Sequence, residues 1–535
     1  MWRVQLVVLC VPLTVVALRA QMSPHAAEPV PEEILTRPVA LQAGIGSMHQ
    51  KVSTSSPMAQ AFYDQGLAYL HSYVWVEAAR SFHQSLRKDP NLGMAYVQLA
   101  DTYIGLQDVV SARKACGVAH NMVSHMSAQE RAWLEIRERE IDYLENSSIE
   151  ASSAYQRSID KALHAYPQDP WLWIQRGLAT EASPFTHGQA SGNAALAFYE
   201  KALALDPKNL AAFHYIIHAN ENLGNIKSAL QESAVYARLA PSIPHAHHMH
   251  GHELVRTGHT GEAIQEFLRT NELEENYYHA EKIPAKYDWH HAHNLQFLAL
   301  SYELLGQDKT AAQLLHQAFL LPASTEFLAY NRKAWPEFLI NHVRYQEALD
   351  AALEMSQGQW AMERLAGHSL AGQALLGLGR LEDAGRELDL ANKEVENMPR
   401  HIAEMLPYPA VLSGQVLLHS GQLREGEEIL VHVIQSALAM PGPDAWLTTI
   451  FMLESLARDA RKVGDWGLAR FVAEQMIEHD PYYAGGHFAI GLVAEHAAET
   501  DGARVMFTQA AKLWEHADPE KPELVLIHKK LSVHN

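Results

Sequence analysis

The sequence contains few cysteines and few basic residues for its length. Cys10 and Cys116 are the only cysteines in 535 residues. This scarcity argues against a disulfide framework and against a thiolate metal cluster. Lysine and arginine number 42 against 62 acidic residues, giving a net charge of -20 at pH 7. Because this charge repels a phosphate backbone, no nucleic-acid partner is expected.

Long apolar runs are also scarce. The first twenty residues, MWRVQLVVLCVPLTVVALRA, place Arg3 before an apolar stretch and Ala20 at its end. The stretch is shorter than the roughly 20 apolar residues that span a bilayer. Residues 1–20 are therefore predicted to be a secretory signal peptide. We expect an exported protein, periplasmic or secreted, with no stable membrane insertion and with Cys116 as its one remaining thiol.

The sequence shows no strand pattern and no glycine-rich phosphate loop. It shows a helical repeat instead. Each unit is numbered so that its closing proline is position 32. In the first unit, the residues at positions 4, 8, 11, 20, 24 and 32 are Phe62, Gly66, Tyr69, Ala78, Phe82 and Pro90, respectively. This spacing resembles the tetratricopeptide repeat (TPR) of 34 residues. Small residues at positions 8 and 20 let two helices approach, and large residues at positions 4, 11 and 24 fill the space between units.

Units with this register cover almost all of the chain after residue 59. We predict an all-α, right-handed TPR superhelical solenoid of about 11–12 helical pairs. The expected parts are a flexible lead-in at 21–58, N-terminal TPR units at 59–209, central His-rich TPR units at 210–325, C-terminal TPR units at 326–516 and a tail at 517–535.

One repeat carries an insertion. Gly258 and Gly306 each end a first helix and lie 48 residues apart, which is one repeat of 34 plus 14. The extra segment, residues 278–291, is rich in aromatic residues and histidine, and loops longer than a fold needs are usually functional. It is predicted to cover the neighbouring groove and to supply either an aromatic wall or His290 as a further ligand. Otherwise its aromatic residues fill a gap between displaced repeats.

Histidine is abundant, with 32 residues, and its spacing follows the repeat. His214 and His218 recur as His248 and His252, 34 residues later. The TPR resemblance implies that positions 2, 5, 9 and 12 of each first helix point into the concave groove. The residues expected there are His214, His218, Glu221, His245, His248, His252 and His293.

These groove residues form a candidate metal site. Histidines four apart share a helical face, and packed helices lie about 8–10 Å apart, so two pairs can close around one ion. Glu221 can complete the site or orient a ligand from behind it. Imidazole and carboxylate without sulfur suit zinc, copper, iron or nickel, and the sequence does not select one.

Two alternatives remain beside the metal. The groove can hold a protein or peptide ligand on its His, Tyr and Glu side chains, or the histidines can be structural. His247 and His250, at positions 4 and 7, are expected to pack against neighbouring helices. The segment HELVR lacks the second histidine of a zinc-protease helix, because Arg256 stands there. Glu253 is accordingly expected to be solvated, and no catalytic residue is assigned.

The chain after the leader also resembles a group of exported bacterial multi-TPR proteins. The shared motifs are HYxxH at His214–His218 and HAxHMxxH at His245–His252, although His250-Gly251 replaces the Pro-Ser of many relatives. The resemblance implies the fold and the histidine site. We therefore expect an exported TPR scaffold or binding protein with a metal-binding groove. The alternative is a metal-dependent enzyme, a hydrolase or an oxidoreductase, with its active site in the same groove.

Overall fold

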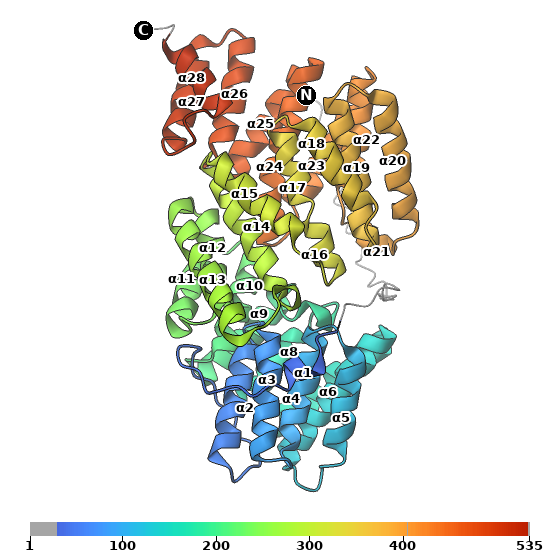
Figure 1. Ribbon diagram of the computed structural model, residues 1–535, viewed down its shortest axis with the longest axis vertical. Coiled ribbons are helices and arrows are strands. Elements are labelled where there is room, and N and C mark those ends of the chain that lie inside the picture. The colour runs from blue at the N-terminus through green and yellow to red at the C-terminus, as the bar shows by residue number, and fades with distance from the viewer. Residues whose placement is uncertain (1–28, 404, 533–535) are drawn as a thin grey trace, which may run out of the picture.

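A computed structural model describes residues 29–403 and 405–532, and in these residues all regular structure is helical (Figure 1). The predicted signal peptide, residues 1–20, lies outside the described residues. Within the described part, no helix combines the length and the apolar character needed to cross a membrane.

Within residues 29–403 and 405–532, consecutive helices pair into twelve hairpins, which confirms the predicted all-α repeat fold. The N-terminal and central hairpins are α2 (Pro57–Leu70) with α3 (Trp75–Lys88), α4 (Gly93–Gly105) with α5 (Val109–His120), α6 (Ala128–Asn146) with α7 (Ile149–Ala165), α8 (Pro170–Leu178) with α9 (Asn193–Leu205), α10 (Leu210–Asn222) with α11 (Ile226–Leu239), α12 (Pro244–Arg256) with α13 (Thr260–Glu281), and α14 (Trp289–Leu304) with α15 (Asp308–Leu320). The C-terminal hairpins are α17 (Ala334–Asn341) with α18 (Tyr345–Ser356), α19 (Ala361–Gly377) with α20 (Leu381–Glu396), α22 (Tyr408–His419) with α23 (Leu423–Leu438), α24 (Pro443–Val463) with α25 (Trp466–His479), and α26 (Ala484–His496) with α27 (Thr500–Leu513). The remaining helices are α1 (Glu32–Leu35), α16 (Glu326–Asn331), α21 (Arg400–Ala403), α28 (Pro522–Ser532) and the 3-10 turns η1 (Pro184–Thr186) and η2 (Ala285–Tyr287).

The two helices of a hairpin approach where the repeat has glycine at position 8. A methyl group on Gly66 would lie 2.5 Å from the ring of Phe82, at position 24 of the same unit. Gly251 has the same relation to Phe267, also at 2.5 Å. Since carbon atoms do not approach this closely, a larger residue would force the helices apart. The repeat positions read from the sequence therefore correspond to real packing contacts.

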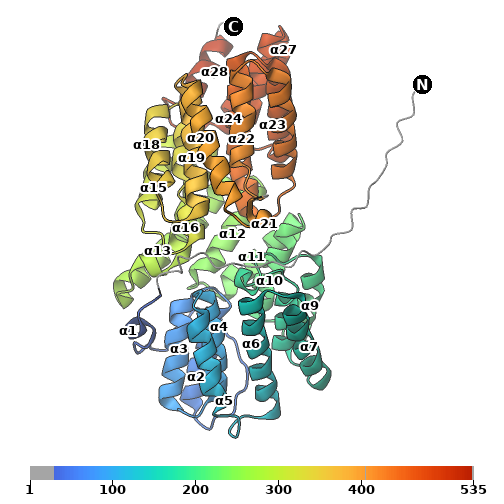
Figure 2. The same ribbon diagram turned by 90° about the vertical axis from the view of Figure 1, so that its right-hand side faces the viewer.

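The hairpins stack into an elongated solenoid (Figures 1 and 2). The helices α2–α9 form one end, α15–α28 form the other, and α10–α14 lie between them. The histidine-rich segment is therefore at the middle of the molecule.

Residues 29–56, within the predicted flexible lead-in, pack against distant repeats. The amide of Ser242 donates to the carbonyl of Gly44 at 2.8 Å, and the Trp171 indole donates to the carbonyl of His49 at 3.3 Å. Arg37 donates to the carbonyl of Glu281 at 2.6 Å. The prediction of flexibility missed these contacts, because an extended segment held by backbone hydrogen bonds shows no apolar periodicity.

The C-terminal units turn back onto the central ones. The amide of Asp518 donates to the carbonyl of Gly306 at 3.0 Å, and Lys521 donates to Asp308 at 2.9 Å. The segment 517–535, predicted as a tail, thus contributes contacts as far as α28, where Ile527 is buried. The folding back brings α24 next to the central histidines.

Candidate metal centre

The predicted groove residues are buried. Each of the six histidines is no more than 6% exposed, and Glu221 is 1% exposed. The part of the groove that these residues line is therefore closed to solvent, and a protein or peptide ligand in the concave groove stays a prediction. The groove is filled by the chain itself, because residues from the first repeat and from α24 cover it.

Three of the histidines converge in the gap between α10 and α12. The Nε2 atom of His214 lies 3.1 Å from Nε2 of His218 and 2.9 Å from Nε2 of His245. We name this group, His214, His218 and His245, site 1.

The other three converge between α12 and α14. The Nε2 atoms of His248 and His252 lie 2.8 Å apart, and His293 completes the group, which we name site 2. Each site thus consists of the histidines at repeat positions 5 and 9 of one unit and the histidine at position 2 of the next unit. The prediction that His214, His218, His248 and His252 enclose a single ion is wrong, because each pair finds its third partner on the following helix.

The outer nitrogens of three of these histidines are held by oxygen acceptors. His214 Nδ1 lies 2.7 Å from the carbonyl oxygen of His71, which can only accept. Nδ1 of His218 and Nδ1 of His252 each lie 3.1 Å from a different oxygen of Glu221. An Nδ1–H therefore donates in each case, and Nε2 is left with its lone pair.

His248 is fixed in the same way through an amide. Its Nδ1 lies 2.9 Å from Oδ1 of Asn294, whose Nδ2 donates to the carbonyl of Phe267 at 3.0 Å. That second bond sets the orientation of the amide, so its oxygen faces the histidine. His248 too must carry its proton on Nδ1.

A relay fixes His245. His290 donates from Nδ1 to Glu274 at 2.5 Å, so its Nε2 is an acceptor. The Nδ1–H of His245 donates to this Nε2 at 3.0 Å. The Nε2 of His245 is therefore also a lone pair, directed at His214.

These assignments bring lone pairs face to face at both sites. Two neutral imidazoles with Nε2 lone pairs 2.8–3.1 Å apart repel unless a cation lies between them. A tetrahedral zinc holds its histidine nitrogens about 3.3 Å apart, so a small opening of each site would admit an ion. Hydrogen-bonded outer nitrogens are the usual arrangement behind metal-ligating histidines.

Burial disfavours the protonated form of four of the six histidines. It lowers the pKa of His214, His245 and His248 well below the usual value, with neighbouring histidines adding to the effect. Burial also lowers the pKa of His293 to about 4. For Glu221, burial raises the pKa, but the hydrogen bonds from its two histidines outweigh burial and hold it well below the usual range. The centre therefore sets these four histidines, which favour the neutral form, beside a buried carboxylate.

Site 2 is less completely fixed than site 1. The Nδ1 of His293 is buried without a hydrogen-bond partner among the described residues. The nearest carboxylate oxygen is Oδ1 of Asp444, at 3.6 Å, at the start of α24. Site 1 is thus the better-organised of the two.

Aromatic residues cover site 1. Tyr73, in the turn between α2 and α3, has its ring 4.5 Å from that of His214 and 4.9 Å from that of His245. Trp289 lies 6.1 Å from His245 and 5.6 Å from His293, measured between ring centroids. The first repeat and the start of α14 together close the centre.

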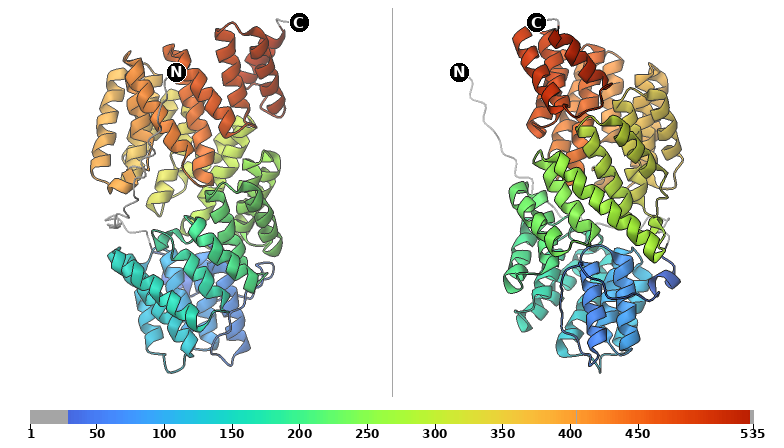
Figure 3. Two further views of the ribbon diagram at one scale, coloured as in Figure 1. Left: turned by 180° about the vertical axis from the view of Figure 1, so that it is seen from behind. Right: turned by 60° about the vertical axis from the view of Figure 1, so that its left-hand side comes forward.

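The insertion is mostly helical. It lengthens α13, which runs toward the N-terminal end of the molecule (Figure 3), and it begins α14. His290 was predicted as a further ligand, but in the structure it bonds to His245 and Glu274 behind site 1. Beside it lies a cavity of about 270 Å³, lined by His245, His290, Glu274, Tyr73 and other residues.

The neighbouring residues on α12 have other partners. His247 bonds to Glu266 at 2.6 Å and His250 bonds to Ser233 at 3.1 Å, so both pack between helices as expected. Glu253 is 0% exposed, which contradicts the expectation that it is solvated. Burial and the nearby Glu221 raise its pKa well above the usual value.

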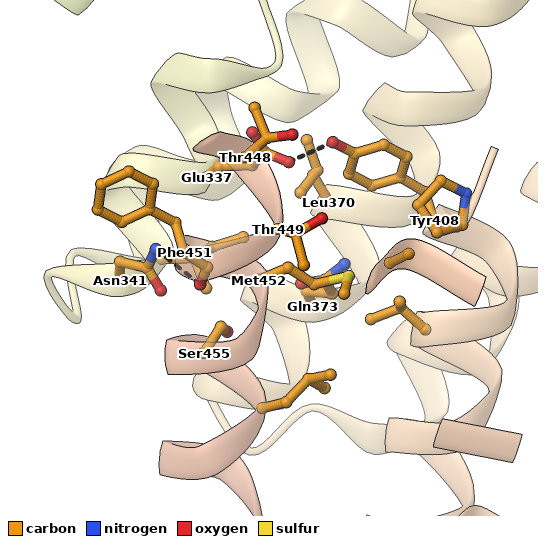
Figure 4. Close-up of a pocket in the computed structure, with 15 residues that line it drawn as sticks. Glu337, Asn341, Leu370, Gln373, Tyr408, Thr448, Thr449, Phe451, Met452 and Ser455 are labelled. Carbon is orange, nitrogen blue, oxygen red and sulfur yellow. Dashed lines mark hydrogen bonds between the residues drawn. The ribbon is translucent and has the colours of Figure 1, made fainter. Parts of the chain in front are cut away.

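Another pocket lies among the C-terminal helices (Figure 4), and no histidine lines it. Its volume is about 70 Å³, and apolar groups line most of it. Tyr408 donates a hydrogen bond to Glu337 there, and Asn341 donates to the carbonyl of Phe451 at 3.2 Å. This pocket adds no ligand to either site.

Sequence reasoning missed four residues that organise the centre. They are His71, Tyr73, Glu274 and Asn294. His71 and Tyr73 belong to the first repeat, and nothing in their spacing relates them to residue 214. Asn294 directly follows His293, so its place on α14 was the one available signal.

No family model and no curated protein matches the sequence. Among solved structures, the chain is similar to a crystal structure of the APC/C hetero-tetramer Cut9-Hcn1, with 13% identity, 88% of this chain and 76% of that chain covered, and a TM-score of 0.36. It is also similar to a tetratricopeptide repeat protein from Parabacteroides merdae ATCC 43184, with 13% identity, 51% of this chain and 96% of that chain covered, and a TM-score of 0.36. The repeat assignment rests on the helical hairpins and their glycine contacts.

Proposed function

We propose that this protein is an exported TPR scaffold that binds two transition-metal ions, one at each three-histidine site. The observation that carries the proposal is that Nε2 atoms of neighbouring histidines face each other with their lone pairs. In five of the six histidines, Nδ1 already donates a hydrogen bond to another group. Packing alone needs no such arrangement, since a structural histidine pair gains more from an N–H···N bond than from two opposed lone pairs.

The donor set defines the class of ion. Three imidazole nitrogens without sulfur suit zinc, copper, iron or nickel, and disfavour magnesium and calcium, which prefer oxygen ligands. Glu221 and Glu274 supply buried negative charge behind the ligands. Three protein ligands also leave a coordination position for an exogenous group.

Metal analysis of untagged protein tests the proposal. We expect about two equivalents of transition metal per chain after reconstitution and dialysis, one for each three-ligand site. His214→Ala with His218→Ala should remove one equivalent, and His248→Ala with His252→Ala the other. Less than a tenth of an equivalent in the wild-type protein, for all four metals, would sink the proposal.

A metal-dependent enzyme, a hydrolase or an oxidoreductase, is the second candidate function. The cavity beside His245 favours it, because a substrate there would lie next to site 1. In such an enzyme the ion would activate water or dioxygen at its open position. Small anions such as azide, added to cobalt-substituted protein, test access: a changed visible spectrum supports an open position, and an unchanged one contradicts the enzyme.

A further inference from the structure

Glu221 touches one ligand of each site. Its Oε2 accepts from His218 of site 1 and its Oε1 accepts from His252 of site 2, both at 3.1 Å. No other carboxylate within the described residues bonds to ligands of both sites. The residue comes from the last turn of α10, and its side chain is fully buried.

We propose that Glu221 is a shared positioning residue, which prepares His218 and His252 for metal together and so links the two sites. This proposal rests on the proposed function, because it concerns the same ions. Each carboxylate oxygen holds one Nδ1–H, and each bond leaves one Nε2 lone pair facing into a site.

Within the described residues, no other hydrogen bond joins the two sites. Site 1 lies between α10 and α12 and site 2 between α12 and α14, so their ions would be about one helix spacing, 8–10 Å, apart. Two ions that share a bridging ligand lie only about 3.5–4 Å apart. The link between these sites therefore runs through hydrogen bonds behind the ligands.

Glu274 provides the contrast. Its carboxylate acts on His245 through His290, and it also accepts from His291. Neither His290 nor His291 forms a hydrogen bond to a site 2 ligand in the described structure, so the hydrogen bonds of Glu274 lead to site 1 alone. The ring of His290 does pack against that of His248 of site 2, at 4.5 Å between centroids. Glu266, which accepts from the packing residue His247, serves neither site.

The decisive substitution is Glu221→Gln. An amide has one oxygen and one NH2 group, so it can accept from only one of the two histidines. The other histidine meets a donor, must accept at Nδ1, and carries its proton on Nε2, where it blocks the metal. Glu221→Gln should therefore disable one site and leave the other intact, whereas Glu221→Ala should weaken both.

The test titrates zinc into protein that keeps all six histidines, by competition with a chromogenic chelator, because only there must the side chain at position 221 serve His218 and His252 together. His248→Ala with His252→Ala and His214→Ala with His218→Ala give the affinity of each site alone in the parent protein. We expect Glu221→Gln to lower the affinity for one of the two zinc ions by about 10–100-fold and for the other by less than about threefold. Glu274→Ala should weaken site 1 alone, and Glu266→Ala should change neither.

Two results would overturn the proposal. Unchanged affinity at both sites in Glu221→Gln would show that the carboxylate does not position the ligands. An equal loss at both sites, accompanied by a lower Tm, would show that Glu221 acts only through packing. Failure of the proposed function is distinct from either result, because the parent proteins with one site each would then bind no zinc at all.

Discussion

The Nε2 atoms of His214 and His218 face each other across 3.1 Å, one helical turn apart on α10. Their Nδ1 atoms bond in different directions, to the carbonyl of His71 and to Glu221. The facing nitrogens are thus presented by two parts of the fold that are far apart in sequence. A cation between them would relieve the repulsion, and His248 and His252 repeat the relation one repeat later.

Replacement of His218 and His252 by alanine should abolish binding at both sites while helical content is retained. Each substitution removes one of three ligands, and the helices are held by packing elsewhere. Metal content and circular dichroism measured on the same samples check this outcome. His247→Ala is the matched control, because that ring lies on α12 but bonds only to Glu266 and the carbonyl of Pro241. If the double variant unfolds, the histidines are structural.

Gly251→Ala should destabilise the protein and weaken metal binding. The new methyl group would lie 2.5 Å from the Phe267 ring, and overpacking of this kind costs about 1–3 kcal/mol. It would also displace α12, which carries ligands of both sites. Urea unfolding and metal titration measure the two effects. Gly385→Ala is the control, since it has open space within 4 Å and should be neutral or stabilising.

Arg137→Met should destabilise the N-terminal repeats by about 3–5 kcal/mol, as expected for breaking a buried ion pair. Arg137 pairs with Asp101 and Glu140, and all three residues are buried. Burial raises the pKa of Glu140 to about 7 even with the arginine present. Chemical denaturation measures the loss, and Arg424→Met, which removes an exposed ion pair with Glu428, should change stability by less than about 1 kcal/mol.

Metal-free protein should lose stability as the pH falls below about 6.5. Burial lowers the pKa of His71 and of His293 to about 4, whereas the unfolded chain titrates near 6.5. Between these values the unfolded state binds more protons, so each such histidine removes up to about 1.4 kcal/mol of stability per pH unit. Thermal unfolding in the presence of a chelator, from pH 7 to pH 4, measures the slope. A Tm that does not change over this range would contradict the burial of neutral histidines.

Much of the fold could be predicted from the sequence because TPR units are local. Gly66 and Phe82 lie within one hairpin, and their contact depends on spacing along a single unit. The spacing within one unit also places His214 and His218 on the same face of their helix. Residues 29–56 could not be placed this way, since their contacts reach Trp171 and Ser242 through backbone hydrogen bonds.

The sequence by itself determined the repeat register, and with it which histidines share a helical face. It also determined that His214 with His218 repeats as His248 with His252, because a period of 34 residues is a property of the chain. Only the tertiary structure decided that these residues form two buried sites rather than one open groove. That outcome depends on how the solenoid closes: His71 and Tyr73 arrive from the first repeat and Asp444 from α24. Such contacts between distant repeats leave no periodic signal, because each is made by a single residue at a single place.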